Sequence, residues 1–299
     1  MKSFLIGLFF KRYPKQIFYP VRMNFAAIKE RVFLKDDFHK TEVSDRHSIV
    51  CQTPFCIAAW SLLKDFDAAS SKLIVEVYNR PVAMLSLKML NKLPESNEFI
   101  YVYQVTNVEC FQLNFFRQYL LLRHLFKSPK HPYEESKIYA ALYSYPRKVI
   151  IVSFRKDDYY NIFPMDFQGY YPEENIYLLG LRTTNITLRK IIELKRVVIS
   201  DIEISDIKTI YGLGAHHSTQ PPPIEELPFK IFESEWLRFP IPEFATAYME
   251  LELVGHQNLG SHTMLIGKVI HLKKIKDNLS SFYHVHFFEQ ALVNYPETN

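Results

Sequence analysis

The amino-acid sequence predicts a mainly β protein with α structure, of the α+β class, whose C-terminal half is an antiparallel β-barrel. Three observations predict this fold. Runs of β-branched and aromatic residues recur along the chain, helical patterns are few and short, and turn residues separate the segments at irregular spacing. Such spacing is typical of an antiparallel barrel and not of a βαβ array. The 299 residues, 48% hydrophobic and 23% charged, suffice for one large domain or two and exclude a disordered or fibrous chain.

The first half of the chain mixes strands and helices. Ser71–Tyr78 and Glu98–Val105 have the composition of strands. Phe111–Phe126 is long, apolar on much of its circumference and free of helix breakers, which predicts a buried helix. The polar segment Lys127–Lys137, which contains prolines, marks a boundary. We therefore predict three parts: a basic and apolar N-terminal arm over residues 1–22, an α+β module of unassigned role over residues 23–140, and a barrel domain over residues 141–299.

The second half alternates strands, turns and short helices. Thr184 and Asn185 stand where an N-cap belongs, so they predict that a helix begins at Ile186. Gly214 ends a second short helix. The predicted strands are Lys148–Phe154, Tyr159–Phe167, Asn175–Arg182, Val197–Ser200, Ala245–Val254, Thr263–Leu272 and Phe282–Phe288, and the predicted helices are Ile186–Leu194 and Ile204–Leu213.

Glycine is scarce, and its positions exclude the common nucleotide-binding loops. The chain has 8 glycines, of which seven lie between Gly169 and Gly267 and none lies from Leu8 through Gln168. Glycine is needed where the backbone takes positive φ or approaches a ligand closely. Neither GxGxxG nor GxxxxGK[ST] occurs, so nucleotide kinases, P-loop ATPases and Rossmann dehydrogenases of the usual kind are excluded.

Charge is distributed unevenly along the chain. The formal net charge is +4, yet residues 1–35 hold eight Lys or Arg against the single acid Glu30, while the rest holds 28 basic and 31 acidic residues. No basic stripe with interleaved aromatic residues occurs outside the N-terminus, so we expect no nucleic-acid partner. The basic start is interpreted as a solvated arm, with a weak surface-binding segment as the alternative.

The cysteine content favours a reducing compartment. Three cysteines are an odd number for a disulfide framework, and Cys51 and Cys56 stand in an apolar stretch where we expect them to be buried. The apolar run Ser3–Phe10 is too short to span a bilayer and lacks a signal-peptide cleavage site, so we expect a cytoplasmic protein without a membrane span. Met23 opens a more ordinary start, and we hypothesise that residues 1–22 are dispensable.

A candidate phosphate site follows the predicted strand that ends at Arg182. Free N–H groups at a helix start, the positive end of the helix dipole and a nearby cation together attract phosphate. The alternative is N-capping of the helix without a ligand. The residues concerned are Arg182, Thr183, Thr184, Asn185 and Thr187.

Two further segments have the composition of a ligand site. Pro164 interrupts the predicted strand Tyr159–Phe167, which can leave backbone groups free for a ligand, and an edge-strand bulge is the alternative. Gly260 and Gly267 bracket an apolar strand and permit the close approach of another body. His262 stands at the entrance of that strand, either as a functional group or as a structural residue.

Together and in this order, the three segments resemble those of the flavin reductase-like family of FMN-binding split barrels. In that family an Asn-led segment lies along the flavin ring, an Arg-x-Ser-x-Thr-type turn binds the FMN phosphate, and a Gly-Asp-His strand closes the site. Asn161–Asp166, Arg182–Thr187 and Gly260–Val269 are similar to those segments, and Tyr211–Phe229 resembles one branch of the family. The resemblance covers residues 145–275, under half of the chain.

The resemblance implies an FMN-binding split barrel over residues 141–299 and an NAD(P)H-dependent flavin (FMN) oxidoreductase. NADH or NADPH then donates hydride to the flavin, while the protein orients the rings and tunes the flavin by hydrogen bonds. His262 is the residue nearest to a catalytic role, and a homodimer with each FMN near the subunit interface is implied. The implied FMN-binding residues are Asn161, Pro164, Met165, Asp166, Arg182, Thr183, Thr184, Asn185 and Thr187.

Two departures from the family pattern keep other functions open. Phe163–Asp166 stands where many relatives have hydroxyl residues that contact the flavin, and Ser261 replaces the acid of Gly-Asp-His. The missing hydroxyl residues favour a first alternative, a non-catalytic FMN-binding flavoprotein that acts as a carrier, sensor or electron-transfer protein. A second alternative is an interaction module with a vacant barrel, in which the first 140 residues are the working part.

The remaining histidines do not define a metal site. His284 and His286 could place two imidazoles on one face of a strand, but no Cys or carboxylate has a matching ligand spacing, so we expect no metal. The adjacent pair His216-His217 defines no site without geometry. The hydrolase motif GxSxG and the zinc motif HExxH are both absent.

Overall fold

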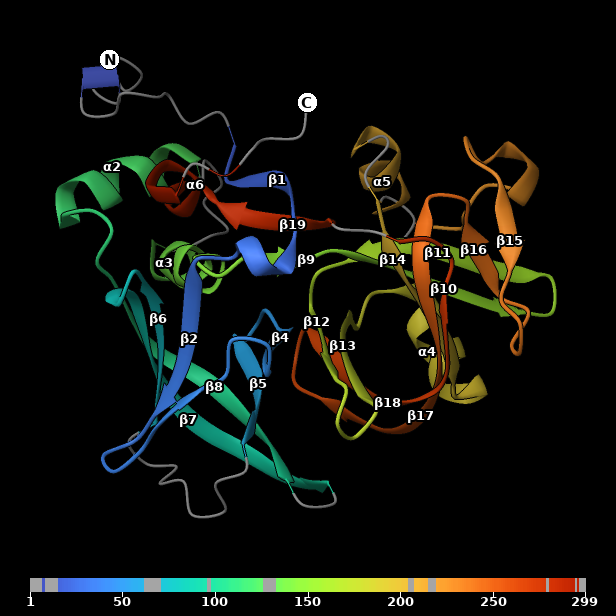
Figure 1. Ribbon diagram of the computed structural model, residues 1–299, viewed down its shortest axis with the longest axis horizontal. Coiled ribbons are helices and arrows are strands. Elements are labelled where there is room, and N and C mark those ends of the chain that lie inside the picture. Colours follow the sequence, from blue (N-terminus) through green and yellow to red (C-terminus); the bar gives the residue numbers. More distant parts are fainter. Residues whose placement is uncertain are drawn as a thin grey trace.

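The computed structural model describes residues 7–8, 16–61, 71–95, 98–125, 133–203, 207–214, 219–277, 280–293 and 295. These residues form two seven-stranded sheets that lie side by side, with a three-stranded sheet at their junction, a separate two-stranded sheet of β15 (Ile231–Glu233) and β16 (Pro240–Pro242), and short helices around them (Figure 1). Every strand pair in the described residues is antiparallel. The predicted class, mainly β with α structure, is therefore confirmed.

The N-terminal sheet has the strand order β3-β2-β6-β7-β8-β5-β4. Its strands bury one face, as in β6, where Leu73, Val75 and Val77 alternate with more exposed residues. Helix α3 packs against β7 and β8. The elements are η1 (Phe25–Ala27), β2 (Glu30–Lys35), β3 (Lys40–Glu42), β4 (His47–Cys51), β5 (Cys56–Ser61), β6 (Lys72–Val77), β7 (Arg80–Glu95), β8 (Glu98–Cys110), α2 (Phe115–Leu125) and α3 (Tyr133–Leu142).

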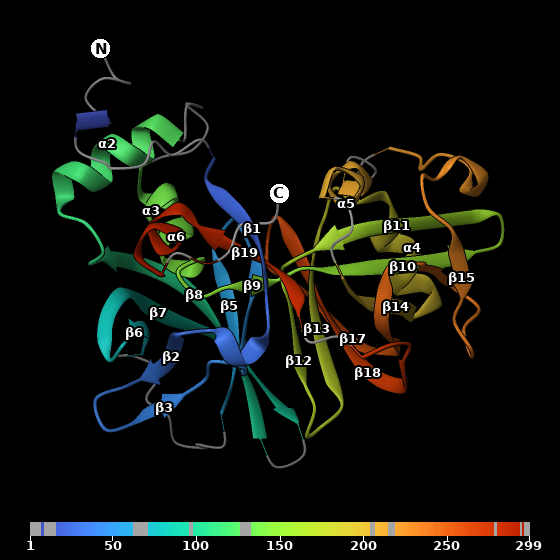
Figure 2. The same cartoon turned by 45° about the horizontal axis from the view of Figure 1, so that its top comes forward.

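The C-terminal sheet has the order β11-β10-β14-β17-β18-β13-β12 and curls into an open barrel (Figures 1 and 2). Two register shifts along β17 bend its long pairing with β18. Helix α4 packs on β10 and β14, and α5 packs on β11. The elements are β10 (Ile150–Lys156), β11 (Tyr159–Met165), β12 (Gln168–Tyr171), β13 (Ile176–Arg182), α4 (Ile186–Leu194), β14 (Arg196–Ile202), α5 (Ile207–Leu213), η3 (Ile224–Glu226), β15 (Ile231–Glu233), β16 (Pro240–Pro242), β17 (Ala245–Asn258) and β18 (His262–Lys274).

The third sheet joins the two ends of the chain. Strand β1 (Phe18–Met23) pairs over its whole length with β19 (Ser281–His286), which also pairs with β9 (Arg147–Lys148) and leads into α6 (Phe287–Val293). Tyr19 and Val21 of β1 are buried in the main core. The interpretation of residues 1–22 as a solvated arm is therefore wrong for residues 18–22, because strand pairing and burial hold them in the body.

The predicted division of the chain places both boundaries inside elements. The boundary at residues 22 and 23 falls within β1, and the boundary at residues 140 and 141 falls within α3. One hydrophobic core cluster extends from the N-terminal sheet into the C-terminal sheet. Whether residues 1–22, 23–140 and 141–299 are separate domains stays a prediction.

Helix α2 differs from the predicted buried helix over Phe111–Phe126. The helix begins at Phe115, because Asn114 accepts hydrogen bonds from the amides of Arg117 and Gln118 through its side chain and carbonyl. Phe115 is 71% exposed, and only three residues of the helix are buried. The prediction of a buried helix is wrong, since α2 packs against α3 and leaves Phe115, Phe116 and Tyr119 exposed.

Two glycines allow the two large sheets to approach each other. A Cβ atom on Gly180 of β13 would lie 2.6 Å from the carbonyl oxygen of Val50 in β4. Gly260 has a φ of +120°, and a Cβ atom there would lie 2.4 Å from the carbonyl oxygen of Thr53. Only glycine fits both positions, so the junction between the sheets depends on them.

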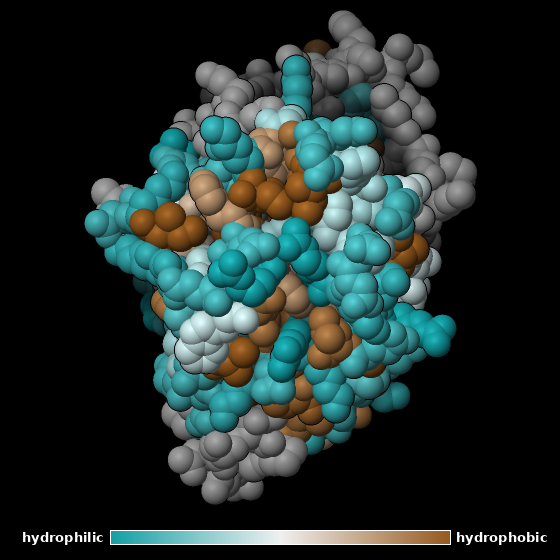
Figure 3. Space-filling view, turned by 90° about the vertical axis from the view of Figure 1, so that its right-hand side faces the viewer, coloured by the Kyte–Doolittle hydropathy of each residue, from teal (hydrophilic) through white to brown (hydrophobic). Residues whose placement is uncertain are grey.

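On the side of the C-terminal sheet, the surface is mostly hydrophilic and its hydrophobic patches are interrupted (Figure 3). The large exposed hydrophobic residues of this half include Phe232, Trp236, Val254 and Leu272. Within the described part of the chain, no helix combines the length and the apolar character needed to cross a membrane.

Candidate functional site

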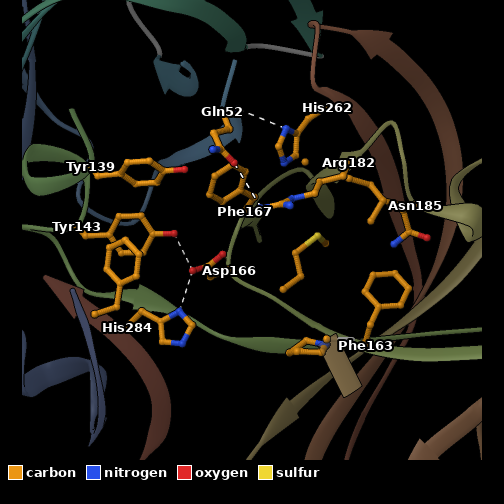
Figure 4. A pocket seen from close by; sticks show the side chains of 16 residues that line it. Gln52, Tyr139, Tyr143, Phe163, Asp166, Phe167, Arg182, Asn185, His262 and His284 are labelled. Carbon is orange, nitrogen blue, oxygen red and sulfur yellow. Dashed lines mark hydrogen bonds and ion pairs between the residues drawn. The ribbon is translucent and has the colours of Figure 1, made fainter. Parts of the chain in front are cut away.

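A cavity of about 400 Å³ opens at the junction between the two large sheets (Figure 4). This volume lies in the usual range for a pocket that holds one small organic ligand. The walls come from β1 and β19, the end of α3, the turn after β4, and strands and loops of the C-terminal half. The lining residues are Phe18, Gln52, Tyr139, Tyr143, Phe163, Pro164, Met165, Asp166, Phe167, Gly180, Leu181, Arg182, Asn185, Gly214, His262 and His284.

One end of the cavity is formed by Arg182 and the start of α4. Arg182 is the last residue of β13, and its guanidinium lies 3.4 Å from the Oε1 atom of Gln52. Asn185 is the N-cap of α4, and its side-chain oxygen accepts a hydrogen bond of 2.8 Å from the amide of Thr187. A cation and a helix start therefore lie together at this end, as the sequence predicts.

His262 lies between the two sheets and is held by several contacts. It is 3% exposed, and its ring centroid lies 5.1 Å from that of Phe167. Its Nδ1 atom is 2.8 Å from the Ser261 hydroxyl and accepts a 3.4 Å contact from the backbone amide of Gln52. Because Nδ1 acts as an acceptor, the proton of the neutral ring lies on Nε2. Figure 4 shows that nitrogen on the side of Arg182.

Asp166 forms the centre of a hydrogen-bond network at the other end of the cavity. Its Oδ2 atom accepts hydrogen bonds of 2.8 Å each from the Tyr143 hydroxyl and from Nδ1 of His284. Nε2 of His284 lies 3.0 Å from the hydroxyl of Tyr211, which is 44% exposed. The network therefore runs from the cavity to the surface of α5.

The network keeps Asp166 ionised. Burial is the largest single effect on its pKa and acts to raise it, but the hydrogen bonds and charge of His284 and the hydroxyl of Tyr143 outweigh burial and hold the pKa below its usual value. The pKa of Tyr143 is raised well above its ordinary value by burial and by the neighbouring carboxylate. Tyr143 therefore remains a hydrogen-bond donor.

The structure brings together some of the sequence-predicted site residues and separates others. Asn161 and Thr187 are fully buried, and the Nδ2 atom of Asn161 donates a 2.8 Å hydrogen bond to the Thr187 hydroxyl, which also lies 2.7 Å from the hydroxyl of Tyr159. The predicted residues that line the cavity are Pro164, Met165, Asp166, Arg182, Asn185 and His262, and those outside its lining are Asn161, Thr183, Thr184 and Thr187.

Sequence reasoning misses the residues that the first half of the chain contributes. Gln52, Tyr139 and Tyr143 lie more than 100 positions from His262 along the chain but line the same cavity. No spacing pattern could identify them, because the contact between the sheets brings them there. The sequence pattern indicates His284 only as a possible metal ligand, whereas its ring is bound to Asp166.

The cysteines and remaining histidines form no separate site in the described residues. Cys51, Cys56 and Cys110 are free and buried, which confirms the expectation for the first two. No group of three or more His, Cys, Asp or Glu residues in this part of the chain is arranged to hold a metal ion. His216-His217 lies outside the described residues.

Comparison with known proteins returns matches of fold. No family model and no curated protein sequence matches the chain. Among solved structures, an FMN-binding protein from Thermus thermophilus is 20% identical over 44% of this chain and 73% of its own, with a TM-score of 0.39. The NADH:FAD oxidoreductase SgcE6 of Streptomyces globisporus is 16% identical over 49% and 85%, with a TM-score of 0.42. The flavin reductase PheA2 is 12% identical over 50% and 95%, with a TM-score of 0.41.

These matches are of the kind that the sequence resemblance named. They are an FMN-binding protein, an NADH:FAD oxidoreductase and a flavin reductase, and each is similar to 44% to 50% of this chain. At these identities and TM-scores the likeness assigns neither ligand nor activity to this chain.

Proposed function

We propose that this protein binds FMN in the cavity at the sheet junction and acts as an NAD(P)H-dependent flavin oxidoreductase. One observation carries the proposal. Segments 161–166, 182–187 and 260–269, which the sequence resemblance relates to the flavin site, each contribute at least one side chain to a single cavity of about 400 Å³. Nothing in the spacing of these segments along the chain requires them to meet.

The residues present fit an FMN molecule. The guanidinium of Arg182 and the start of α4 supply positive potential for a phosphate. Phe163 and Phe167 supply flat apolar surface for an aromatic ring system (Figure 4), and Pro164 lines the same cavity. The cavity therefore offers a charged end and an apolar wall, which matches a ligand that has a phosphate at one end and a fused ring at the other.

The residues of the chain would position the ligand and exclude water. A bound flavin supplies the hydride-accepting chemistry. His262 holds a proton at Nε2 on the Arg182 side of the cavity, where it can donate a hydrogen bond. Tyr139 and Tyr143 cover the opposite side and restrict the entry of water. Asp166 accepts hydrogen bonds from Tyr143 and His284, and so fixes the positions of these two side chains in the wall.

A spectrum of the purified protein tests the proposal. A flavin absorbance that bleaches when NADH or NADPH is added without oxygen supports the oxidoreductase. The rates of bleaching by NADH and by NADPH at equal concentration show which donor the protein prefers. A yellow protein that does not bleach supports the alternative, a non-catalytic FMN carrier, sensor or electron-transfer protein. Phe163–Met165 favours that alternative, because these side chains bring no hydroxyl into the cavity. A colourless protein that does not take up added FMN contradicts both.

We further propose a homodimer located in the cytoplasm. The resemblance supports the dimer, and the three free thiols support a reducing compartment. Light scattering coupled to size exclusion measures the mass in solution. A mass equal to one chain of 35.4 kDa, with and without FMN, contradicts the dimer.

A further inference from the structure

The carboxylate of Asp166 uses only one of its two oxygens in the network described above. Both protein donors, Tyr143 and His284, bind Oδ2. Within the described residues, Oδ1 accepts no hydrogen bond from another side chain, and the Asp166 side chain is 20% exposed in the cavity wall. Figure 4 shows the second oxygen on the side of the cavity centre. The cavity therefore presents a carboxylate oxygen that accepts from no other described side chain, and the backbone amide of Asp166 is the one further protein donor to this carboxylate.

The groups that surround Asp166 keep this oxygen an acceptor. Tyr143 and His284 donate to the carboxylate, and Tyr211 contacts the far nitrogen of His284. Arg147, which lies opposite His284 in the pairing of β9 with β19, adds a buried positive charge. Burial lowers the pKa of Arg147 to about 10, so it stays protonated at neutral pH. The surrounding charge thus favours the ionised form of Asp166.

We infer that Oδ1 of Asp166 selects the ligand of this cavity, by accepting a hydrogen bond from an N–H group on the edge of an uncharged planar ring and by repelling a negatively charged edge. An ionised oxygen that lacks a side-chain donor in a partly buried site keeps unused acceptor capacity, so a ligand with a donor gains binding energy there. In terms of the proposed function, on which this inference rests, the donor is the imide N–H of the flavin ring.

His284 and Tyr211 are positioning residues in this inference. His284 fixes the carboxylate through Oδ2, and Phe18 stacks on the His284 ring with centroids 6.4 Å apart and planes inclined by 25°. Tyr211 fixes the ring from the other side. Both act through Asp166, so their loss should weaken the selection without reversing it.

Three small probes test the selection without a flavin. Phthalimide carries an imide N–H on a planar uncharged ring, N-methylphthalimide lacks that hydrogen, and phthalate replaces the imide with two carboxylates. Binding to the full chain is measured by NMR titration. We expect phthalimide to bind about tenfold more tightly than N-methylphthalimide, and phthalate not to displace phthalimide from Asp166. Equal affinity for the first two, or no binding of phthalimide up to its solubility limit, overturns the inference.

Asp166→Asn provides the matched variant. Its carbonyl oxygen can still accept from Tyr143 and His284, which turns an N–H donor of the amide toward the cavity. The preference for phthalimide over N-methylphthalimide should then vanish, while Tyr211→Phe should reduce it only in part. Thermal unfolding checks that both variants fold. A variant Asp166→Asn that is folded and keeps the full preference contradicts the inference.

The same variant separates this inference from the proposed function. Affinity for FMN and for FMN methylated at the imide nitrogen is measured by flavin fluorescence. If wild type binds both equally, flavin binding stands and the selection by Asp166 fails. If neither flavin binds but the phthalimide preference is present and lost in Asp166→Asn, the selection stands and the proposed function fails.

Discussion

Arg182 is the residue on which the proposed orientation of the ligand depends. Its guanidinium is at the cavity wall and, in the part of the chain that the structure describes, pairs with no carboxylate but lies 3.4 Å from the neutral side chain of Gln52, so its charge is available to an anion. We expect Arg182→Ala to weaken FMN binding about tenfold or more and to leave riboflavin, which has no phosphate, nearly unchanged. Fluorescence titration with both ligands measures the difference.

Thr187→Ala is the informative comparison for that prediction. The Thr187 hydroxyl is buried between Asn161 and Tyr159 and does not reach the cavity, so its loss should lower stability and affect both ligands alike. A selective loss of FMN binding in Thr187→Ala, with none in Arg182→Ala, would show that the phosphate lies elsewhere.

Buried histidines make the protein sensitive to acid. Burial lowers the pKa of His286 to about 3, and the pKa of His47 lies well below its ordinary value because of burial and the charge of Arg147. Below pH 6.5 the unfolded chain takes up protons that the folded chain does not, so stability falls as pH decreases. The expected loss approaches about 1.4 kcal/mol per pH unit for each residue.

Urea unfolding between pH 7 and pH 5 measures this effect. His286→Gln should unfold with a weaker pH dependence than wild type, because one of the two groups no longer titrates. His256→Gln, at an exposed position of β17, is the control and should keep the wild-type dependence. An identical pH dependence in His286→Gln and wild type would mean that His286 takes up protons equally in the folded and unfolded states.

Among the elements, β1 makes the clearest prediction about stability. It pairs with β19 over six residue pairs and buries Tyr19, Val21 and Met23. A chain that begins at Met23 loses nearly all of this strand and exposes β19, so we expect it to lose more than about 3 kcal/mol of stability or to fail to fold. A chain that begins at Gln16 keeps β1 and is the control.

That truncation also tests the hypothesis that residues 1–22 are dispensable. Thermal unfolding and far-UV circular dichroism of the two chains give the comparison. Equal melting temperatures would support the hypothesis and contradict the importance of β1.

Most strands of the second half could be predicted because their signals are local. Hydrophobic runs predict β10, β13 and β14, and the N-cap Asn185 predicts the start of α4. The exposed face of α2 and the pairing of β1 could not be predicted, because both depend on surfaces supplied by distant segments. The same holds for the site. Arg182, Asn185 and His262 follow from motifs, whereas Tyr143 and His284 reach the cavity only through the tertiary fold.

At the scale of the whole molecule, the contact between the two large sheets depends on Gly260. Its φ is +120°, and a Cβ atom at this position would lie 2.4 Å from the Thr53 carbonyl oxygen, which leaves no space for alanine. We expect Gly260→Ala to cost about 3 kcal/mol or more and to disturb the neighbouring Gln52 at the cavity. Differential scanning calorimetry measures the stability.

Gly212→Ala is the matched control for that substitution. A Cβ atom at Gly212 meets nothing within 4 Å, and the residue lies inside α5, where alanine favours the helix. We expect Gly212→Ala to lose no stability, or to gain about 0.5 to 1 kcal/mol. A similar loss of stability in Gly260→Ala and Gly212→Ala would contradict the prediction that stability depends on the sheet contact at Gly260.

The cavity takes its walls from both halves of the chain, with Gln52, Tyr139 and Tyr143 on one side and Arg182 and His262 on the other. By thermodynamic linkage, a ligand bound in this cavity stabilises the contact between the two halves. An occupant that binds only the assembled cavity adds RT ln(1 + [L]/Kd) to the stability of the assembly, about 2.7 kcal/mol at a hundredfold excess over Kd. The ligand would therefore protect both halves from proteolysis together, and the protection would report its affinity without any turnover.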